Sequence, residues 1–357
     1  MDINLAISIV ISALSCAVLI PLVSAGARRF GLVDKPIGRK QHAGDVPVVG
    51  GLSIYFATII ALFSAYLFSS ALVPLLVGSA LLILGVIDDR VGLRTVIRFP
   101  VQAATALVMM AVGGIGIESV GNIAGFGPVL FTGAASVVFT IVCTVGVINS
   151  INMIDGVDGL SGTIISITLA TLAYFNYLAG DMASVALLLS LLAATLVFLI
   201  FYNSRLFRPR AAIFMGDAGS TLFGFVLVWY FIQLTQGEGA VLSPVAAGWI
   251  FGLPLLDTVV VMVGRVIKKQ SPFAADRTHL HYRLQDAGAS VNQTVFILGA
   301  LHLFMVLVGL MCNVSPIVAE PVFFWSFVLL VLSHFFFTPY ILAEVKNRGW
   351  MRLLDQR

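Results

Sequence analysis

Long apolar stretches alternate with short polar segments along the whole chain. An apolar run of about 17–25 residues is long enough to cross a bilayer as one helix. The pattern predicts eleven transmembrane helices, at residues 3–25, 49–69, 71–87, 99–114, 131–149, 161–179, 183–201, 219–236, 242–263, 292–312 and 321–342. We therefore expect an all-α integral membrane protein that forms a single polytopic domain over residues 1–357.

The composition agrees with this pattern and excludes a soluble globular domain. Hydrophobic residues make up 59% of the chain and charged residues only 10%, whereas soluble domains carry about a quarter charged residues.

The positive charges orient the chain in the membrane. Segments 26–48, 88–98, 202–218, 264–291 and 343–357 hold 5, 3, 3, 5 and 4 Lys and Arg, which account for all 20 in the sequence. Cytoplasmic loops are rich in Lys and Arg, so we place these segments in the cytoplasm together with the C-terminus. The N-terminus is then outside, and the turn at 150–160 is a further cytoplasmic loop.

Basic residues gather in the first of these loops. The segment DKPIGRKQHAGDVPVVGG, at 34–51, contains Lys35, Arg39 and His42. These side chains are able to hold a phosphate group. The alternative is a basic loop that only sets topology or meets anionic lipid.

An acidic pair, Asp88 and Asp89, ends the third predicted helix. Adjacent carboxylates repel each other unless cations compensate, and Arg98 is one of three nearby arginines. Such a pair binds Mg²⁺ or accepts a proton. The alternative is a solvated helix end.

The segment NSINMIDGVDGLSG, at 149–162, places amides and acids between two apolar stretches. Asn149, Asn152, Asp155 and Asp158 recur about every third residue, so on a helix end they share one face. Oxygen ligands of this kind suit Mg²⁺. A polar turn that satisfies its own hydrogen bonds is the alternative.

Two further segments extend the polar face. In AAIFMGDAGSTLFG, Asp217 lies at the start of the eighth predicted helix, where free N–H groups favour phosphate and where an acid is also an ordinary cap. In SPFAADRTHLHYRL, Arg277, His279, His281 and Arg283 form a basic cluster suited to phosphate or sugar, or a solvated loop.

One acid, Asp257, lies inside the ninth predicted helix. An acid within the membrane needs a partner, and both structural pairing and support of a site remain open. Together, the cytoplasmic segments predict phosphate chemistry with Mg²⁺ at one membrane face. The apolar body suits a lipid-tailed partner.

These segments, in this order, resemble the polyprenyl-phosphate N-acetylhexosamine-1-phosphate transferases. The matching pieces are DKPIGRKQHAGDVPVVGG, DDR, NSINMIDGVDGL, FMGDAGSTL, TQGEGAVLSPVAAGWI, PLLD and SPFAADRTHLHYRL. The resemblance is strongest to the bacterial branch that moves GlcNAc-1-phosphate from UDP-GlcNAc to undecaprenyl phosphate. It implies an enzyme of the bacterial cytoplasmic membrane that uses Mg²⁺, with Mn²⁺ as a substitute, at the first step of O-antigen or related polysaccharide synthesis. No nucleic acid is expected as a partner, and a homodimer is left open.

The resemblance also implies roles for individual residues. Asp88 and Asp89 match the acidic pair that deprotonates the lipid phosphate, and Asn152 and Asp217 match the Mg²⁺ ligands. The substrate contacts that we expect, from the matches and from position in the polar segments, are Lys35, Arg39, His42, Arg98, Asp155, Asp158, Phe214, Arg277, His279, His281 and Arg283. Among these, Phe214 is expected to stack on uracil and Asp158 to hydrogen-bond it.

Two positions depart from the family pattern. Gly92 stands where close relatives carry a third acid, and Tyr282 stands where their loop has a further histidine. Tyr282 cannot take a positive charge near neutral pH. The donor sugar is therefore open between GlcNAc and another UDP-HexNAc, such as GalNAc or a 6-deoxy sugar. A cation-coupled transporter and a lipid-binding scaffold are the alternatives from other classes.

Overall fold

The structure is a computed structural model that describes residues 3–34, 44–67, 72–274, 276–314, 320–349 and 351. It divides into two compact units. Unit 1 comprises Met1–Ile117 and Gly133–Val241, and unit 2 comprises Glu118–Thr132 and Leu242–Arg357. The single polytopic domain and its orientation across the membrane stay predictions.

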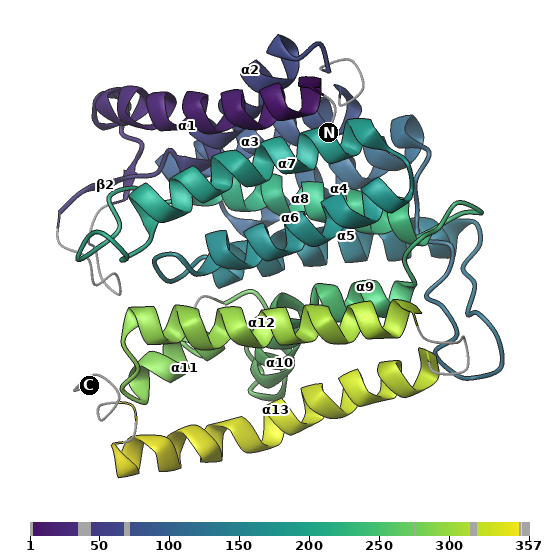
Figure 1. Ribbon diagram of the computed structural model, residues 1–357. Coiled ribbons are helices and arrows are strands. Elements are labelled where there is room, and N and C mark those ends of the chain that lie inside the picture. Colours follow the sequence, from purple (N-terminus) through teal and green to yellow (C-terminus); the bar gives the residue numbers. More distant parts are fainter. Residues whose placement is uncertain are drawn as a thin grey trace. The chain divides into compact units, whose positions relative to one another are not determined.

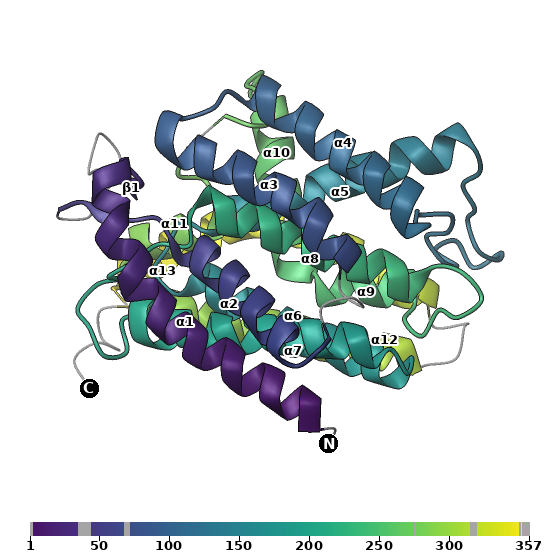
Figure 2. The ribbon, with the colours of Figure 1, turned by 90° about the horizontal axis from the view of Figure 1, so that it is seen from above.

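Unit 1 is a bundle of helices around α8 (Figures 1 and 2). Its elements are α1 (Ile3–Phe30), β1 (Val33–Asp34), β2 (Val46–Pro47), α2 (Gly50–Ser64), α3 (Leu72–Val91), α4 (Thr95–Gly113), α5 (Ala134–Ile154), α6 (Leu160–Leu178), α7 (Met182–Phe198), the π-turn Leu199–Asn203 and α8 (Gly216–Thr235). Helices α2, α3, α5 and α6 all contact α8. All but four of the 20 residues of α8 are buried, so this helix is the core of the unit.

Glycines allow α8 to approach its neighbours closely. A Cβ on Gly51 of α2 would lie 2.1 Å from the Cα of Gly219, and a Cβ on Gly85 of α3 would lie 2.3 Å from the Cα of Ala218. Small residues let helix backbones pack at short range in membrane proteins. These contacts fix the first turn of α8 against α2 and α3.

The described part of unit 2 contains the loop 118–132 and five helices. They are α9 (Pro244–Ile250), α10 (Gly252–Ile267), α11 (Leu280–Asp286), α12 (Val291–Val314) and α13 (Glu320–Arg348). In Figure 1, α10 and α11 lie between the long helices α12 and α13, and both contact them.

The structure confirms a helical multi-span membrane protein but not the predicted eleven spans. Each predicted stretch falls on a helix or a helix pair. Among the described residues, seven helices are long and apolar enough to cross a membrane, or eight if α9 and α10 form one span. Helix α2 has only 15 residues, and α3 and α6 also fall outside this set.

The described residues also contain one short strand pair, in which β1 and β2 pair Val33 with Pro47 and Asp34 with Val46 in antiparallel register. One further expectation needs correction. The ninth predicted helix is broken at Phe251, where α9 and α10 meet at 81°. Periodicity does not reveal this bend, because both helices belong to one apolar run.

The close approach of α3 to α8 predicts that alanine substitutions at two glycines have very different effects on stability. Gly85→Ala should destabilise the protein by about 1–3 kcal/mol, because the new methyl group overpacks against the α8 backbone. Gly146→Ala in α5 should be neutral or stabilising, since no described atom lies within 4 Å of its added Cβ. Thermal unfolding of both variants in detergent measures this; equal melting temperatures would contradict the packing account.

Candidate functional site

The carboxylate of Asp89 caps the N-terminus of α8 from a different helix. Its Oδ1 accepts a hydrogen bond from the backbone N–H of Asp217 at 2.8 Å, and its Oδ2 accepts one from Ala218 at 3.2 Å. The first N–H groups of a helix have no partner within the helix, and an acid there is favourable. Asp89 lies in the last turn of α3, beyond the apolar stretch, and so sets the position of Asp217.

The residue before Asp217 must be small for this arrangement. Gly216 has a φ of +78°, in the left-handed region. A Cβ at this position would lie 2.7 Å from Oδ2 of Asp89. Glycine meets both requirements at once.

Asp88, the other acid of the pair, faces a different partner. Its Oδ2 forms an ion pair with Nη1 of Arg98 in α4 at 2.8 Å, and its Oδ1 accepts from the N–H of Leu93 at 2.6 Å. The predicted compensation of the acidic pair by a nearby arginine is thus observed for Asp88. Asp89 is instead held by backbone N–H groups.

Asn152 connects this ion pair to Asp217. Arg98 donates from Nη2 to Oδ1 of Asn152 at 3.3 Å. The Nδ2 of Asn152 donates to Oδ1 of Asp217 and, at 2.9 Å, to Oγ of Ser220. The side chains that meet here come from four helices: α3, α4, α5 and α8. They form one continuous polar cluster, which we call the α8 cluster. Its members are Asp88, Asp89, Arg98, Asn152 and Asp217.

The acids of the α8 cluster are poorly solvated. Burial, and then the charge of Asp217, raise the pKa of Asp88 above its ordinary value. The same two causes raise the pKa of Asp89 to about 8. Burial also raises the pKa of Asp155, which lies just after α5, to about 6. Among the described residues, the α8 cluster contains three acids, Asp88, Asp89 and Asp217, and one arginine, Arg98. This balance of charge favours an added cation.

The residues present fit a Mg²⁺ ion whose remaining ligands come from substrate and water. Asp217 offers a carboxylate and Asn152 an amide oxygen, Oδ1, which accepts from Arg98 in this structure, while the Nδ2 of Asn152 contacts Asp217. Within the described part of the chain, no group of three or more His, Cys, Asp or Glu is arranged to hold a metal. Mg²⁺ commonly takes only one or two protein carboxylates and completes its shell with water and phosphate oxygens.

The expectation that Asn149, Asn152, Asp155 and Asp158 share a helix face was wrong. Helix α5 ends at Ile154, so only the two asparagines are helical. Asn149 is buried and donates from Nδ2 to Gln102 at 2.7 Å. Asp155 and Asp158 follow the end of α5 and so do not belong to this helix face.

Each of the two acids has a separate local partner. Asp155 accepts a hydrogen bond from the hydroxyl of Ser161. Asp158 forms an ion pair with Nε of Arg205 at 2.7 Å and accepts from the N–H of Ala211 at 3.2 Å, both through Oδ2. Asp158 therefore anchors the segment that leads into α8.

The backbone of Phe214 connects the polar segment 211–224 to the polar segment 34–51. Its N–H donates to the carbonyl of Pro47 at 3.0 Å, and its carbonyl accepts from the N–H of Gly50 at 3.0 Å. Phe214 as a whole is half-buried. Lys35, Arg39 and His42, predicted in the same first segment, lie outside the described residues.

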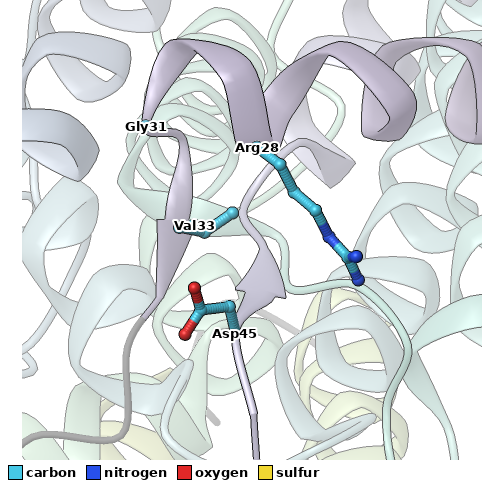
Figure 3. A pocket seen from close by; sticks show the side chains of 4 residues that line it. All are labelled: Arg28, Gly31, Val33 and Asp45. Atoms are coloured by element: carbon cyan, nitrogen blue, oxygen red, sulfur yellow. The ribbon is translucent and has the colours of Figure 1, made fainter.

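A hollow in unit 1 lies between the end of α1 and the strands. Figure 3 shows its lining residues, Arg28, Gly31, Val33 and Asp45, and its volume is about 290 Å³. None of the four belongs to the α8 cluster. The hollow therefore does not coincide with the predicted chemistry.

In unit 2, the predicted basic cluster is arranged around acids. His279 meets Asp257, with 2.8 Å between Nδ1 and Oδ2, and Asp257 also accepts from the N–H of Leu280. Arg265 of α10 forms a two-pronged ion pair with Asp276 and approaches His279. The role of Asp257 stayed open from the sequence, where the only signal was an acid inside an apolar helix, and Arg265 and Asp276 were not predicted as its neighbours in this cluster.

The other basic residues lie in or beside α11. The guanidinium of Arg277 lies over the ring of Tyr282 at 4.4 Å and pairs with Asp286 at 3.3 Å. Arg283 is half-buried on α11. His281 is buried, and burial lowers its pKa to about 4, so this ring is neutral near pH 7.

Comparisons with known proteins identify the class of this site. The sequence matches the family described as Glycosyl transferase family 4 over residues 71–235. It is 35% identical over 330 residues to the undecaprenyl-phosphate alpha-N-acetylglucosaminyl 1-phosphate transferase of Yersinia pestis, covering 91% of this chain and 86% of that protein. The proteins of the same description from Escherichia coli K12 and Haemophilus influenzae are 34% and 32% identical, over 91% and 93% of this chain and 86% and 92% of theirs.

The helical architecture and these matches define a multi-span membrane phosphotransferase. The chain belongs to glycosyl transferase family 4. The resemblance drawn from the ordered motifs is thereby confirmed, as is the prediction of an enzyme.

The cap on α8 predicts graded effects of changing Asp89. Asp89→Ala removes both acceptors for the Asp217 and Ala218 N–H groups and should cost about 1–2 kcal/mol of stability. Asp89→Asn keeps one acceptor oxygen and should cost less. Thermal unfolding in detergent measures both losses.

A matched control is Asp181→Asn, because Asp181 caps α7 within its own chain segment by accepting from the N–H of Ser184 at 3.0 Å. This control should lose stability but keep enzymatic turnover. If Asp89→Ala unfolds at the same temperature as the wild type, the cap contributes nothing to stability.

Proposed function

We propose that this enzyme transfers N-acetylhexosamine-1-phosphate from a UDP-linked donor to undecaprenyl phosphate and releases UMP. The expected donor is UDP-GlcNAc. The observation that carries the proposal is the α8 cluster, in which Asp217 and Asn152 contact each other beside a partly compensated acidic pair. Relatives with 32–35% identity over most of both chains support the reaction class, and their names support the GlcNAc donor.

The residues have distinct roles in this proposal. Asn152 and Asp217 hold Mg²⁺, which when bound neutralises charge on the diphosphate oxygens of the donor. Asp88 or Asp89 accepts the proton of the lipid phosphate, whose oxygen then attacks the β-phosphorus of the donor. The bond from this phosphorus to the UMP oxygen breaks, so the anomeric bond of the sugar is retained. Positioning and electrostatics supply most of the barrier reduction in phosphoryl transfer.

The remaining predicted contacts surround this chemistry. Arg98 donates to Asp88 and Asn152 and is proposed to hold a phosphate. Phe214 is proposed to stack on uracil and Asp158 to hydrogen-bond it, although one oxygen of Asp158 already serves Arg205. The proposed substrate contacts elsewhere are Lys35, Arg39, His42, Asp155, Arg277, His279, His281 and Arg283.

The cellular setting also belongs to the proposal. The relatives are bacterial, and the enzyme is placed in the cytoplasmic membrane with its site on the cytoplasmic side. The product, a sugar on undecaprenyl diphosphate, is proposed to begin O-antigen or related polysaccharide synthesis.

The reaction is tested with purified protein, undecaprenyl phosphate and Mg²⁺, with UMP release as the readout. UDP-GlcNAc, UDP-GalNAc and a 6-deoxy UDP-HexNAc are offered separately. We expect UMP from UDP-GlcNAc, loss of release with EDTA, and a decrease of at least about 10²-fold in Asp217→Ala, because the proposed metal site loses its carboxylate.

The control is Glu344→Gln, which changes an exposed acid of α13 and should keep the wild-type rate. UMP mainly from another sugar would retain the chemistry and change the donor. No UMP from any donor, with lipid and metal verified, would contradict the proposed reaction.

A further inference from the structure

The segment between the π-turn and α8 presents apolar side chains at the surface of unit 1. It comprises residues 204–210, which we call the 204–210 loop, and within it Leu206 and Phe207 are 69% and 72% exposed. The arginines of the loop are Arg205, Arg208 and Arg210. Large apolar residues next to basic ones are typical of segments that lie at a membrane surface.

The base of the 204–210 loop is held by Asp158. Its Oδ2 accepts from Nε of Arg205 at 2.7 Å and from the N–H of Ala211 at 3.2 Å, so one carboxylate binds the chain on both sides of the loop. The N–H of Ala212 also donates to the carbonyl of Tyr202 at 2.7 Å. The side chain of Arg205 therefore points toward the protein, and residues 206–210 form an exposed tip on a fixed base.

The ring of Phe207 continues the outer surface of a membrane span. The segment Met182–Asn203 is long and apolar enough to cross a membrane, and Phe201 in its last turn is 53% exposed. The rings of Phe201 and Phe207 are stacked, with 6.3 Å between their centroids and 15° between their planes. Because Phe201 belongs to the span, Phe207 lies at the depth where the span ends. Aromatic residues are enriched at this depth, where the membrane meets water.

Arg208 carries the positive charge that accompanies these rings. It is exposed, and its guanidinium lies over the ring of Tyr202 at 5.8 Å. Within the described part of the chain, no acid forms an ion pair with it. A guanidinium over an aromatic ring keeps its N–H donors, which match the oxygens of a phosphate. The phosphate of an anionic lipid has the charge and the acceptors that suit this position.

We propose that the 204–210 loop is a binding surface for anionic phospholipid. Leu206 and Phe207 enter the headgroup region beside Phe201, and Arg208 binds the lipid phosphate. The stacking of Phe207 on a ring of the span favours lipid over an acidic protein, because it places the tip at the membrane surface. This lipid is distinct from the substrates of the proposed reaction, and the proposal does not rest on that reaction.

Fluorescence quenching measures the depth of the tip. Phe207→Trp adds one indole to the 4 tryptophans of the chain, and the wild type in matched vesicles supplies the background. The vesicles contain phosphatidylcholine and phosphatidylglycerol with bromine near the headgroup end of the acyl chains. We expect the brominated lipids to quench the added emission and aqueous acrylamide to leave it nearly unchanged. Quenching by acrylamide without quenching by lipid would place the tip in water and overturn the proposal.

Moving the bromine between the two lipids tests whether the loop selects anionic lipid. The composition is kept constant, and either phosphatidylglycerol or phosphatidylcholine carries the bromine. At equal amounts of brominated lipid, phosphatidylglycerol should quench Phe207→Trp about two- to fivefold more, the enrichment expected of one arginine at an anionic surface. Adding Arg208→Gln should lower this ratio toward equality. Equal quenching by the two lipids while Arg208 is present would overturn the selection of anionic lipid.

Arg205→Gln is the matched control, because it removes the same charge from the same loop. Arg205 donates to Asp158, so this change should lower the melting temperature and leave the quenching ratio unchanged. Arg29→Gln, which removes an exposed charge at the end of α1, replaces this control if the Arg205 variant does not fold. A control that lowers the ratio as much as Arg208→Gln would overturn the assignment of Arg208, because net charge alone would then attract the lipid.

Discussion

The pair of hydrogen bonds from the α8 backbone to Asp89 is the interaction on which the rest of the site depends. Helix α8 is almost wholly buried from Ala218 onward, and the first N–H groups of a helix have no partner within the helix. Asp89 satisfies two of them and fixes the helix start. The same contact sets the position of Asp217, which then meets Asn152 of α5.

Close backbone packing makes this arrangement possible. Gly51 and Gly85 allow α2 and α3 to touch the first turn of α8, and Gly216 makes room for the Asp89 carboxylate. A side chain at any of these positions would displace the turn that carries Asp217. The glycines of the motifs therefore serve the geometry of the acids beside them.

The acids of the two units have different kinds of partner. In unit 2, Asp276 has Arg265 and Asp257 has His279, so each acid has its own basic partner. In the α8 cluster, Arg98 pairs with Asp88, while Asp89 and Asp217 are held by backbone or amide groups. An acid with its own basic partner suits a structural or positioning role, whereas a surplus of acids over arginines suits a site that binds a cation.

The sequence predicted most of the α8 cluster because its residues sit at the ends of apolar runs. Asp88, Asp89, Asn152 and Asp217 were all identified in this way. It did not predict where α5 ends, which depends on the turn after Ile154, or the ion pair between Asp158 and Arg205. These depend on tertiary contacts that periodicity does not record.

Other features were hidden for similar reasons. The bend between α9 and α10 lies within one apolar run, and α2 proved too short for a full span. Asp257 was conspicuous as an acid in an apolar helix, but its partners His279 and Leu280 lie more than 20 residues away. Family motifs identified the loop, whereas only the structure showed which ring nitrogens are engaged.

The most direct test of the account measures whether the start of α8 binds the metal and nucleotide. Melting temperatures are compared with and without Mg²⁺ and UDP-GlcNAc together, in the wild type and in Asp217→Asn. A ligand at 100 times its Kd stabilises by about 2.7 kcal/mol, so the wild type should melt at a clearly higher temperature only when both are present. Asp217→Asn should lose this increase; an equal increase in both proteins would contradict the central role of Asp217.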